Sequence, residues 1–550
     1  MKVLRPRAGW SAGVLLGAWI ATLLFAATLV AQSAGSTSSS TTQQLRQALA
    51  LAQSGDKSGA MNLVQQLLQR DPKFVPAIKL KGMLLEETGK AAEAGTVYEQ
   101  GLSLAPNDPD LLLKTGVYKL ASGEHEQAVA LLEHSTRVNP NDGDAQYYLA
   151  QAYHLSGDDK AALAAIRVSL KVDPNNPSVW QKYGELLCNT GDCVGGLKWL
   201  LKAQKTGAAL PRIDYDIAVT DFKLMDLAGA AQSAQRAVTS QPDDAAAWQL
   251  LAAVSVKLAK WQEAEGAFKQ LLVFKPNDVE ALLGLGQCQV ELKDYSTAVG
   301  TLQSVLRLDP TRLLAHFYLS RAFAGLGKTD EAEHEARLHQ LMMEQATFVR
   351  STADEQRENA IKAEARQLLK AHREEDALRL YTEHFKGTSA TRADAYVFVG
   401  KTYLFMGATE DGLRNLRRAL QVDPKVRGAH TYEGILALRD RDLSKAESEF
   451  QAELANDPSY QTALAEMGEV RYHQGRWADA AEQIAVSHTM TPELLFLLCD
   501  SYFHLGDTKN AGLTAELVAA YGRNNPALMK ELQNLLRVNG QVELAQRLGS

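Results

Sequence analysis

The sequence has few of the residues that mark a disulfide-built or nucleic-acid-binding protein. Its 550 residues include only four cysteines, which is too few for a scaffold built from disulfides. Lys and Arg number 58 against 65 Asp and Glu, a net charge of −7, and no basic run occurs. Such a chain is a poor candidate for binding nucleic acid. Apolar residues make up 46%, which suffices for a core in a chain too long for one ordinary compact domain.

Motifs of enzymes and metal sites are also missing. There is no G-x-S-x-G sequence for a nucleophilic serine. In the segment GLGKTDEA at 325–332, Gly327-Lys328-Thr329 resembles the end of a phosphate-binding loop, but Ala322 stands where that loop needs a glycine. His334 and His339 are five residues apart and lack the H-E-x-x-H spacing that places two metal ligands on one helical face. We therefore predict no enzyme activity, no metal site and no cofactor.

The first 31 residues differ from the rest of the chain. Three positive charges precede the apolar run GVLLGAWIATLLFAATLVA at 13–31, which is typical of an export signal and also long enough to span a bilayer. Cleaved or retained as an inner-membrane anchor, this leader places the later residues outside the cytoplasm. No usable Asn-x-Ser/Thr sequon is present, which favours a periplasmic or other extracytoplasmic bacterial location.

After a Ser/Thr-rich linker, prolines recur with a step of 34 residues, or 68 where one is skipped. The first series comprises Pro72, Pro106, Pro140, Pro174, Pro242, Pro276 and Pro310, and the second comprises Pro424, Pro458, Pro492 and Pro526. Small residues follow the same period, for example Ala162, Gly196 and Ala230. A spacing this regular indicates repeated structural units.

Each unit reads as a pair of helices. In DAQYYLAQAYHLSGDDKAALAAIRVSLKVDPNNP, residues 144–177, apolar side chains recur at helical intervals in two segments. Gly157 suits the left-handed residue that ends the first helix, and Asp158 can cap the second. Proline then ends the second helix. The small residue of the second helix lets the partner helix approach closely.

This pattern resembles the tetratricopeptide repeat, whose signature is W-x2-L-G-x2-Y, A-x3-F and P on a 34-residue period. The unit at 245–276 matches it at Trp248, Leu251, Ala264, Phe268 and Pro276. The resemblance covers about residues 41–526 and implies an all-α, right-handed solenoid of about thirteen helix hairpins in two arrays. The predicted parts are a leader (1–31), a linker (32–42), an amino-terminal array (41–336), a degenerate charged joint (337–392), a carboxy-terminal array (393–526) and capping helices (527–550).

The resemblance also implies a concave face lined by the first helix of each unit, through its positions 2, 5, 9 and 12. These positions supply the predicted partner-binding groove: Lys79, Tyr147, Gln151, His154, Gln181, Glu185, Arg212, Tyr215, Gln249, Gln287, Phe317, Arg321, Lys401 and Phe496. Amides can pair with a peptide backbone, and aromatics supply anchoring area. The expected partners are proteins or peptides, with membrane contact only through an uncleaved leader; the sequence leaves the oligomeric state open.

Cys188 and Cys193 flank the turn of one hairpin in the stretch CNTGDC. No further His or Cys stands nearby to complete a zinc site, and the spacing differs from the C-x-x-C of redox pairs. An oxidising compartment favours a disulfide across the turn, and two free core thiols are the alternative. Cys288 and Cys499 are expected to be buried.

These features predict a non-catalytic binding scaffold of the cell envelope. The alternative is an accessory subunit that positions an enzyme or a substrate chain, as in envelope assembly, secretion or polysaccharide export.

Overall fold

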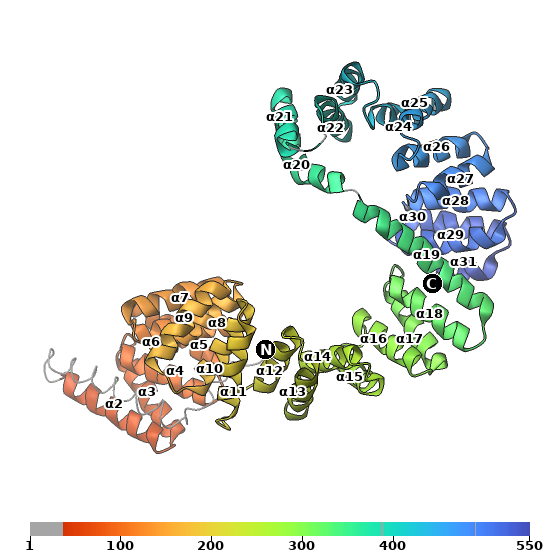
Figure 1. The fold of residues 1–550 in the computed structure, drawn as a ribbon. Helices are drawn as coiled ribbons and strands as arrows, with labels where there is room; N and C mark the ends of the chain where they lie inside the picture. Colours follow the sequence, from red (N-terminus) through yellow and green to blue (C-terminus); the bar gives the residue numbers. More distant parts are fainter. Residues whose placement is uncertain (1–36, 352, 387, 389, 490, 550) are drawn as a thin grey trace. The chain divides into compact units, whose positions relative to one another are not determined.

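The computed structural model of the protein describes residues 37–549 except 352, 387, 389 and 490, and the side chains of 37–39, 345–351 and 353–357 are not described. Within that part every regular element is an α-helix, and consecutive helices pair into hairpins, α2 with α3 through α30 with α31 (Figure 1). The all-α hairpin architecture expected from the sequence is confirmed.

The chain divides into two compact units, Met1–Phe274 and Lys275–Ser550. The helices of unit 1 are α2 (Thr37–Gln53), α3 (Lys57–Arg70), α4 (Val75–Glu87), α5 (Ala91–Leu104), α6 (Pro109–Ala121), α7 (His125–Val138), α8 (Gly143–Leu155), α9 (Asp159–Val172), α10 (Pro177–Asn189), α11 (Cys193–Gln204), α12 (Ile213–Lys223), α13 (Leu227–Ser240), α14 (Ala245–Lys257) and α15 (Trp261–Phe274).

The helices of unit 2 are α16 (Val279–Glu291), α17 (Tyr295–Leu308), α18 (Leu313–Gly325), α19 (Thr329–Ser351), α20 (Ala353–Lys370), α21 (Glu374–His384), α22 (Arg392–Phe405), α23 (Thr409–Val422), α24 (Ala429–Arg439), α25 (Leu443–Asn456), α26 (Gln461–His473), α27 (Trp477–Val486), α28 (Pro492–His504), α29 (Thr508–Gly522), α30 (Pro526–Val538) and α31 (Val542–Leu548).

The hairpin turns form as the Gly-Asp pairs predict. Gly157 follows α8 with φ of 85°, and the Asp158 side chain accepts a hydrogen bond from the backbone N–H of Ala161 at the start of α9. The same turn position is held by Met225 and Lys293 at φ of 63° and 65°. These two residues adopt a left-handed conformation that costs a non-glycine side chain energy.

Small residues at the helix crossings close each hairpin. Ala162 and Ala264 are completely buried there. The α10–α11 hairpin is tighter still, because a Cβ placed on Gly196 would lie 2.5 Å from the carbonyl oxygen of Gly184. The sequence predicts alanine or glycine at the crossing, but in this hairpin only glycine fits.

Two of the periodic prolines play a different part from the one expected. Pro492 and Pro526 are the first residues of α28 and α30 and do not follow the end of a second helix. Proline is well suited to the first helical position, because its fixed φ is helical and the N–H it lacks has no helical acceptor there. The prolines thus keep their 34-residue spacing, but in this part of the chain they stand at the start of a hairpin's first helix.

The charged stretch at 337–392 forms the end of α19 and the hairpin α20–α21. At 23 residues α19 is longer than the second helices of most other hairpins, as expected for a helix that continues into this stretch. Leu338 and Met342 of α19 share a buried cluster with residues of α28, α29 and α30. The predicted boundary at 336/337 does not coincide with the division at Phe274/Lys275, and the two arrays remain a prediction.

The predicted leader, residues 1–31, lies outside the described residues. In the part of the chain that is described, no helix has both the length and the apolar character of a membrane span.

Candidate functional site

The first helices of unit 1 carry most of the predicted groove residues. Lys79 is on α4; Tyr147, Gln151 and His154 are on α8; Gln181 and Glu185 are on α10; Arg212 and Tyr215 are at the start of α12; and Gln249 is on α14. The other predicted residues, Gln287, Phe317, Arg321, Lys401 and Phe496, belong to unit 2. The candidate site is therefore the set in unit 1.

Helices α8, α10 and α12 bring these side chains together. His154 Nε2 lies 3.2 Å from Glu185 Oε1, and Lys182 Nζ lies 2.5 Å from Glu185 Oε2. On the next helix, Asp216 accepts a hydrogen bond of 2.6 Å from Gln181 Nε2. We call the set Tyr147, Gln151, His154, Gln181, Lys182, Glu185, Arg212, Tyr215 and Asp216 the first-helix cluster.

Partial burial and neighbouring charge set the protonation of this cluster. Burial opposes ionisation of Glu185, yet the Lys182 ammonium and the His154 bond lower the pKa of Glu185 to about 2. Burial and the negative charge of Glu185 raise the pKa of Asp216 to about 7. The bond to Glu185 also raises the pKa of His154, although burial opposes it. At neutral pH, Glu185 is ionised and faces a positive charge, and Asp216 is near its midpoint.

Aromatic side chains flank the charged groups. The amide of Gln151 donates a 3.0 Å hydrogen bond to the Tyr147 hydroxyl. The Arg212 guanidinium lies 4.1 Å from the centre of the Tyr215 ring and 3.3 Å from Asp244. Such an arrangement offers flat apolar area together with hydrogen-bonding groups, which is what a bound polypeptide segment requires.

Lys79 and Lys401 occupy settings different from an open groove. Lys79 is only 7% exposed, and its ammonium lies 3.1 Å from Asp108 and 2.5 Å from Asp110. It thus ties α4 to the start of α6. Lys401 forms an ion pair with Glu358 of α20, and both side chains are largely buried. We assign both lysines to the connection between hairpins and leave them out of the proposed binding surface.

Two members of the cluster escaped the sequence prediction. Lys182 and Asp216 stand at position 6 of their repeats, and only positions 2, 5, 9 and 12 were considered. Their signal in the sequence is a pair of charged residues 34 apart, at a position that holds Leu80 and Leu250 in other first helices. At position 6, Asp216 of α12 accepts a hydrogen bond from Gln181 of the neighbouring first helix α10, whereas Lys182 pairs with Glu185 on its own helix.

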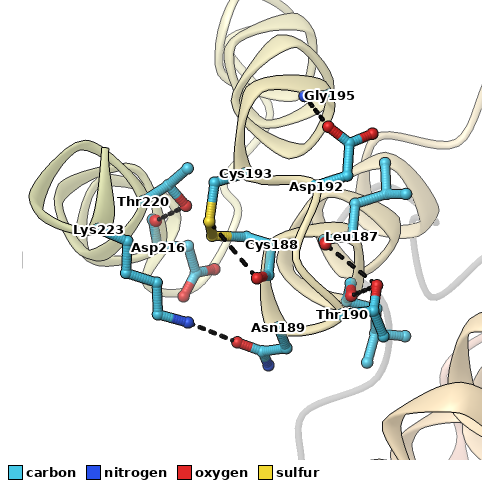
Figure 2. The surroundings of a disulfide bond; sticks show 11 residues. Leu187, Cys188, Asn189, Thr190, Asp192, Cys193, Gly195, Asp216, Thr220 and Lys223 are labelled. Carbon is cyan, nitrogen blue, oxygen red and sulfur yellow. Dashed lines mark hydrogen bonds between the residues drawn. A yellow bond between two sulfur atoms is a disulfide. The ribbon is translucent and has the colours of Figure 1, made fainter. Parts of the chain in front are cut away.

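The turn CNTGDC borders the cluster. Cys188, near the end of α10, and Cys193, the first residue of α11, are joined by a disulfide with a Cα–Cα distance of 3.7 Å. Figure 2 shows Asp216, Thr220 and Lys223 of α12 beside this bridge. Lys223 Nζ donates a 2.9 Å hydrogen bond to the Asn189 side chain. The bridged turn is thus fastened to the next first helix.

An open hollow of about 690 Å³ adjoins the same turn, between the turns of the hairpins α8–α9 and α10–α11. Its lining includes Asp158, Asp159, Asn189 and Thr190. Each of them has an internal partner: Asp158 caps α9, Asp159 bonds His154, Asn189 accepts from Lys223, and Thr190 donates to backbone carbonyls. The hollow therefore belongs to the edge of the cluster and forms no separate site.

The segments that resemble a phosphate-binding loop and a metal site serve the fold. Gly327 forms the left-handed turn between α18 and α19, with φ of 74°. His334 and His339 diverge on α19, since His334 bonds Glu516 and the His339 ring lies 5.6 Å from the Phe317 ring. No group of three or more His, Cys, Asp or Glu side chains within the described residues is arranged to hold a metal ion. Cys288 and Cys499 are free and buried.

Comparison with known proteins places this geometry in a family. Two sequence models described as tetratricopeptide repeat match the chain, one at residues 119–186 and the other at 45–109, 254–312, 400–461 and 433–487. The type IV pilus assembly protein PilF of Pseudomonas aeruginosa is 32% identical over 110 residues, 20% of this chain and 43% of PilF. The chain thus spans less than half the length of this curated relative.

Solved structures with a similar fold include PilF of Pseudomonas aeruginosa, at 16% identity and a TM-score of 0.34, over 40% of this chain and 97% of that one. Another is YrrB, a tetratricopeptide repeat protein with an unusual peptide-binding site, at 17% identity and a TM-score of 0.29, over 34% of this chain and 96% of that one.

Proposed function

Because this chain belongs to the tetratricopeptide repeat proteins, we propose that it is a non-catalytic scaffold of the cell envelope that binds a protein or peptide along the first helices of unit 1. Tetratricopeptide repeats mediate protein or peptide binding, and their stacked first helices form the extended surface for it. The function resides in this surface and needs no cofactor.

The observation that carries the proposal is the first-helix cluster. Three successive first helices, α8, α10 and α12, present tyrosines, amides and charged groups that already compensate one another. A guest that binds here meets Glu185 and Arg212 already paired with groups of the protein. Tyr147 and Tyr215 supply the aromatic area on which such guests gain most of their binding energy.

The location rests on the leader at 1–31, which is typical of an exported chain. The match to PilF supports a role in envelope assembly, because PilF is a type IV pilus assembly protein. The match covers 20% of this chain, so the pathway itself stays open. An accessory subunit that holds an enzyme or a substrate chain would use the same surface.

The test is capture of partners from an envelope extract with the purified chain as bait. We expect Tyr147→Ala combined with Tyr215→Ala to reduce capture of the retained partner at least about tenfold, since two anchoring side chains are lost. The matched control is Leu201→Ala, which removes an exposed apolar side chain from the second helix α11. Far-ultraviolet circular dichroism must show equal helicity in all three proteins. Undiminished capture by the double variant would contradict the proposal.

A further inference from the structure

The outer face of the second helices is exposed in most hairpins. Two positions define this face, two and six residues after the small residue of the crossing. In α27 they hold Glu482 and Val486, and both are exposed. In α23 they hold Arg414 and Arg418, which are also exposed. Three of these four residues are charged, as suits positions that face solvent, and Val486 is apolar but exposed.

Helices α19 and α29 depart from that pattern together. In α29 the two positions hold Leu513 and Leu517, which are 3% and 2% exposed. In α19 they hold His334, which is partly buried, and Leu338, which is 1% exposed. All three leucines belong to one buried cluster. Two second helices separated by well over a hundred residues thus bury the faces that their counterparts leave in water.

Polar contacts surround this apolar patch. His334 Nε2 lies 2.8 Å from Glu516 Oε2 of α29, and Arg547 of α31 pairs with the other oxygen of Glu516. Arg523, at the end of α29, donates a 2.9 Å hydrogen bond to the carbonyl oxygen of Arg307 at the end of α17. The contact therefore has an apolar centre and a polar rim, which is the anatomy of a docking interface.

We propose that α29 is a docking surface for the chain's own α19, and that the two helices form a releasable clasp that holds the intervening helices α20–α28 between fixed ends. The occupant is identified by the buried cluster, in which Leu338 and Met342 of α19 lie with Leu513 and Leu517. The clasp is releasable because its central contacts, Leu338 with the α29 leucines and His334 with Glu516, lie on one face of each helix. Interfaces within a chain allow motion unless they are large and hydrophobic.

The ion pair makes the clasp sensitive to pH. The groups that face His334 are Glu516 of α29, Arg547 of α31 and Glu335 of α19 itself. The bond to Glu516 raises the pKa of His334, although burial opposes it. For Glu516, burial alone would raise the pKa, but the His334 bond and charge, Arg547 of α31 and His316 of α18 lower it.

The directions of the two pKa shifts give the pH range in which the clasp is most stable. A raised His334 pKa stabilises the closed form fully below the ordinary value of 6.5, and this contribution is lost as pH rises through the higher closed-state value. A lowered Glu516 pKa stabilises the closed form above the ordinary value of 4.5, and this contribution is lost as pH falls through the lower closed-state value. The clasp is therefore strongest between pH 4.5 and 6.5 and weakens as the solution becomes alkaline.

The clasp is tested by amide hydrogen exchange in the full chain. Leu517→Glu places a charge in the buried face of α29, and we expect the amides of residues 329–344 in α19 to exchange at least about tenfold faster. The matched control is Val486→Glu, at the equivalent position of α27, where the side chain is 53% exposed. Unchanged exchange in α19 despite the Leu517→Glu substitution would overturn the proposal.

A conservative pair of variants guards against a simple folding defect. After correction for intrinsic rates, protection of α19 in the unaltered chain should fall several-fold between pH 6 and pH 8.5, and His334→Gln should abolish that fall. His473→Gln, on an exposed histidine of α26, should behave like the unaltered chain. A fall that persists in His334→Gln would contradict the role of the ion pair. A doubled mass with concentration-dependent protection would mean that the occupant is a second copy, and would overturn the intrachain clasp.

Discussion

The hairpins α10–α11 in unit 1 and α28–α29 in unit 2 depart from the common repeat on opposite sides. The first carries its unusual residues on and around its first helix: Lys182, Glu185, the glycine crossing and the disulfide. The second carries them on the outer face of its second helix, at Leu513 and Leu517. The difference shows that one two-helix module offers two independent surfaces. A departure from the common pattern on either surface indicates what that surface contacts.

The largest effect is expected at the crossing of α10 and α11. Gly196→Ala would set a Cβ 2.5 Å from the Gly184 carbonyl oxygen, so the helices must separate, at a cost of about 3 kcal/mol. Urea unfolding followed by the fluorescence of Trp180 and Trp199, which contact each other in this hairpin, measures it. An unchanged midpoint would show that the two backbones can move apart freely.

The next largest loss of stability is expected when the Glu185 carboxylate of the first-helix cluster is removed. Glu185→Gln leaves Lys182, only 15% exposed, without its anionic partner, and we expect a loss of about 2–3 kcal/mol in unfolding free energy. Replacing both groups, as in Lys182→Met with Glu185→Gln, should recover much of the loss. Equal stability of the single and double variants would show that the pair contributes nothing as a pair.

Removal of the disulfide should have a smaller effect. Cys188→Ala with Cys193→Ala opens a short loop, so the unfolding free energy should fall by about 2 kcal/mol. Alkylation checks the premise. The unfolded chain without reductant should react at Cys288 and Cys499 alone, since these are the free cysteines. Reaction at all four would show that the bridge had not formed.

The smallest expected effect is a gain in stability, opposite in sign to the losses above, and it concerns a glycine of α29. A Cβ added to Gly512 in α29 meets only a Leu544 methyl group at 3.8 Å, an ordinary contact. Gly512→Ala should therefore stabilise the helix by about 0.5–1 kcal/mol. Thermal unfolding of this variant beside Gly196→Ala separates a glycine demanded by packing from one that is not. Destabilisation of both would contradict that separation.

The sequence predicted what is local and repeated. Helix pairing, the glycine turns and the aspartate caps follow from residues within one unit, because each needs neighbours only a few positions away. Tyr147, Gln151, His154 and Glu185 lie on first helices, α8 and α10, as the repeat period predicts, and their role in a groove stays a prediction.

What the sequence did not predict depends on contacts between units or between distant segments. Asp216 joins the cluster only because it lies beside Gln181 of the preceding first helix. Lys182 is the local exception, because its partner Glu185 lies three residues further along the same helix. The hydrogen bond between His334 and Glu516 joins residues that are 182 apart in the sequence. The 34-residue period does not predict such a contact. Pro492 kept the 34-residue spacing but opens a helix, because proline fits either side of a helix boundary and spacing alone does not distinguish them.

The disulfide begins and ends within a single hairpin, so it crosses no boundary between neighbouring modules. The disulfide therefore limits how far the α10–α11 turn can open, while the hairpins on either side are held to it by noncovalent contacts alone. Covalent stiffening is thus confined to the one hairpin whose first helix lies, in chain order, between the helices that carry Tyr147 and Tyr215.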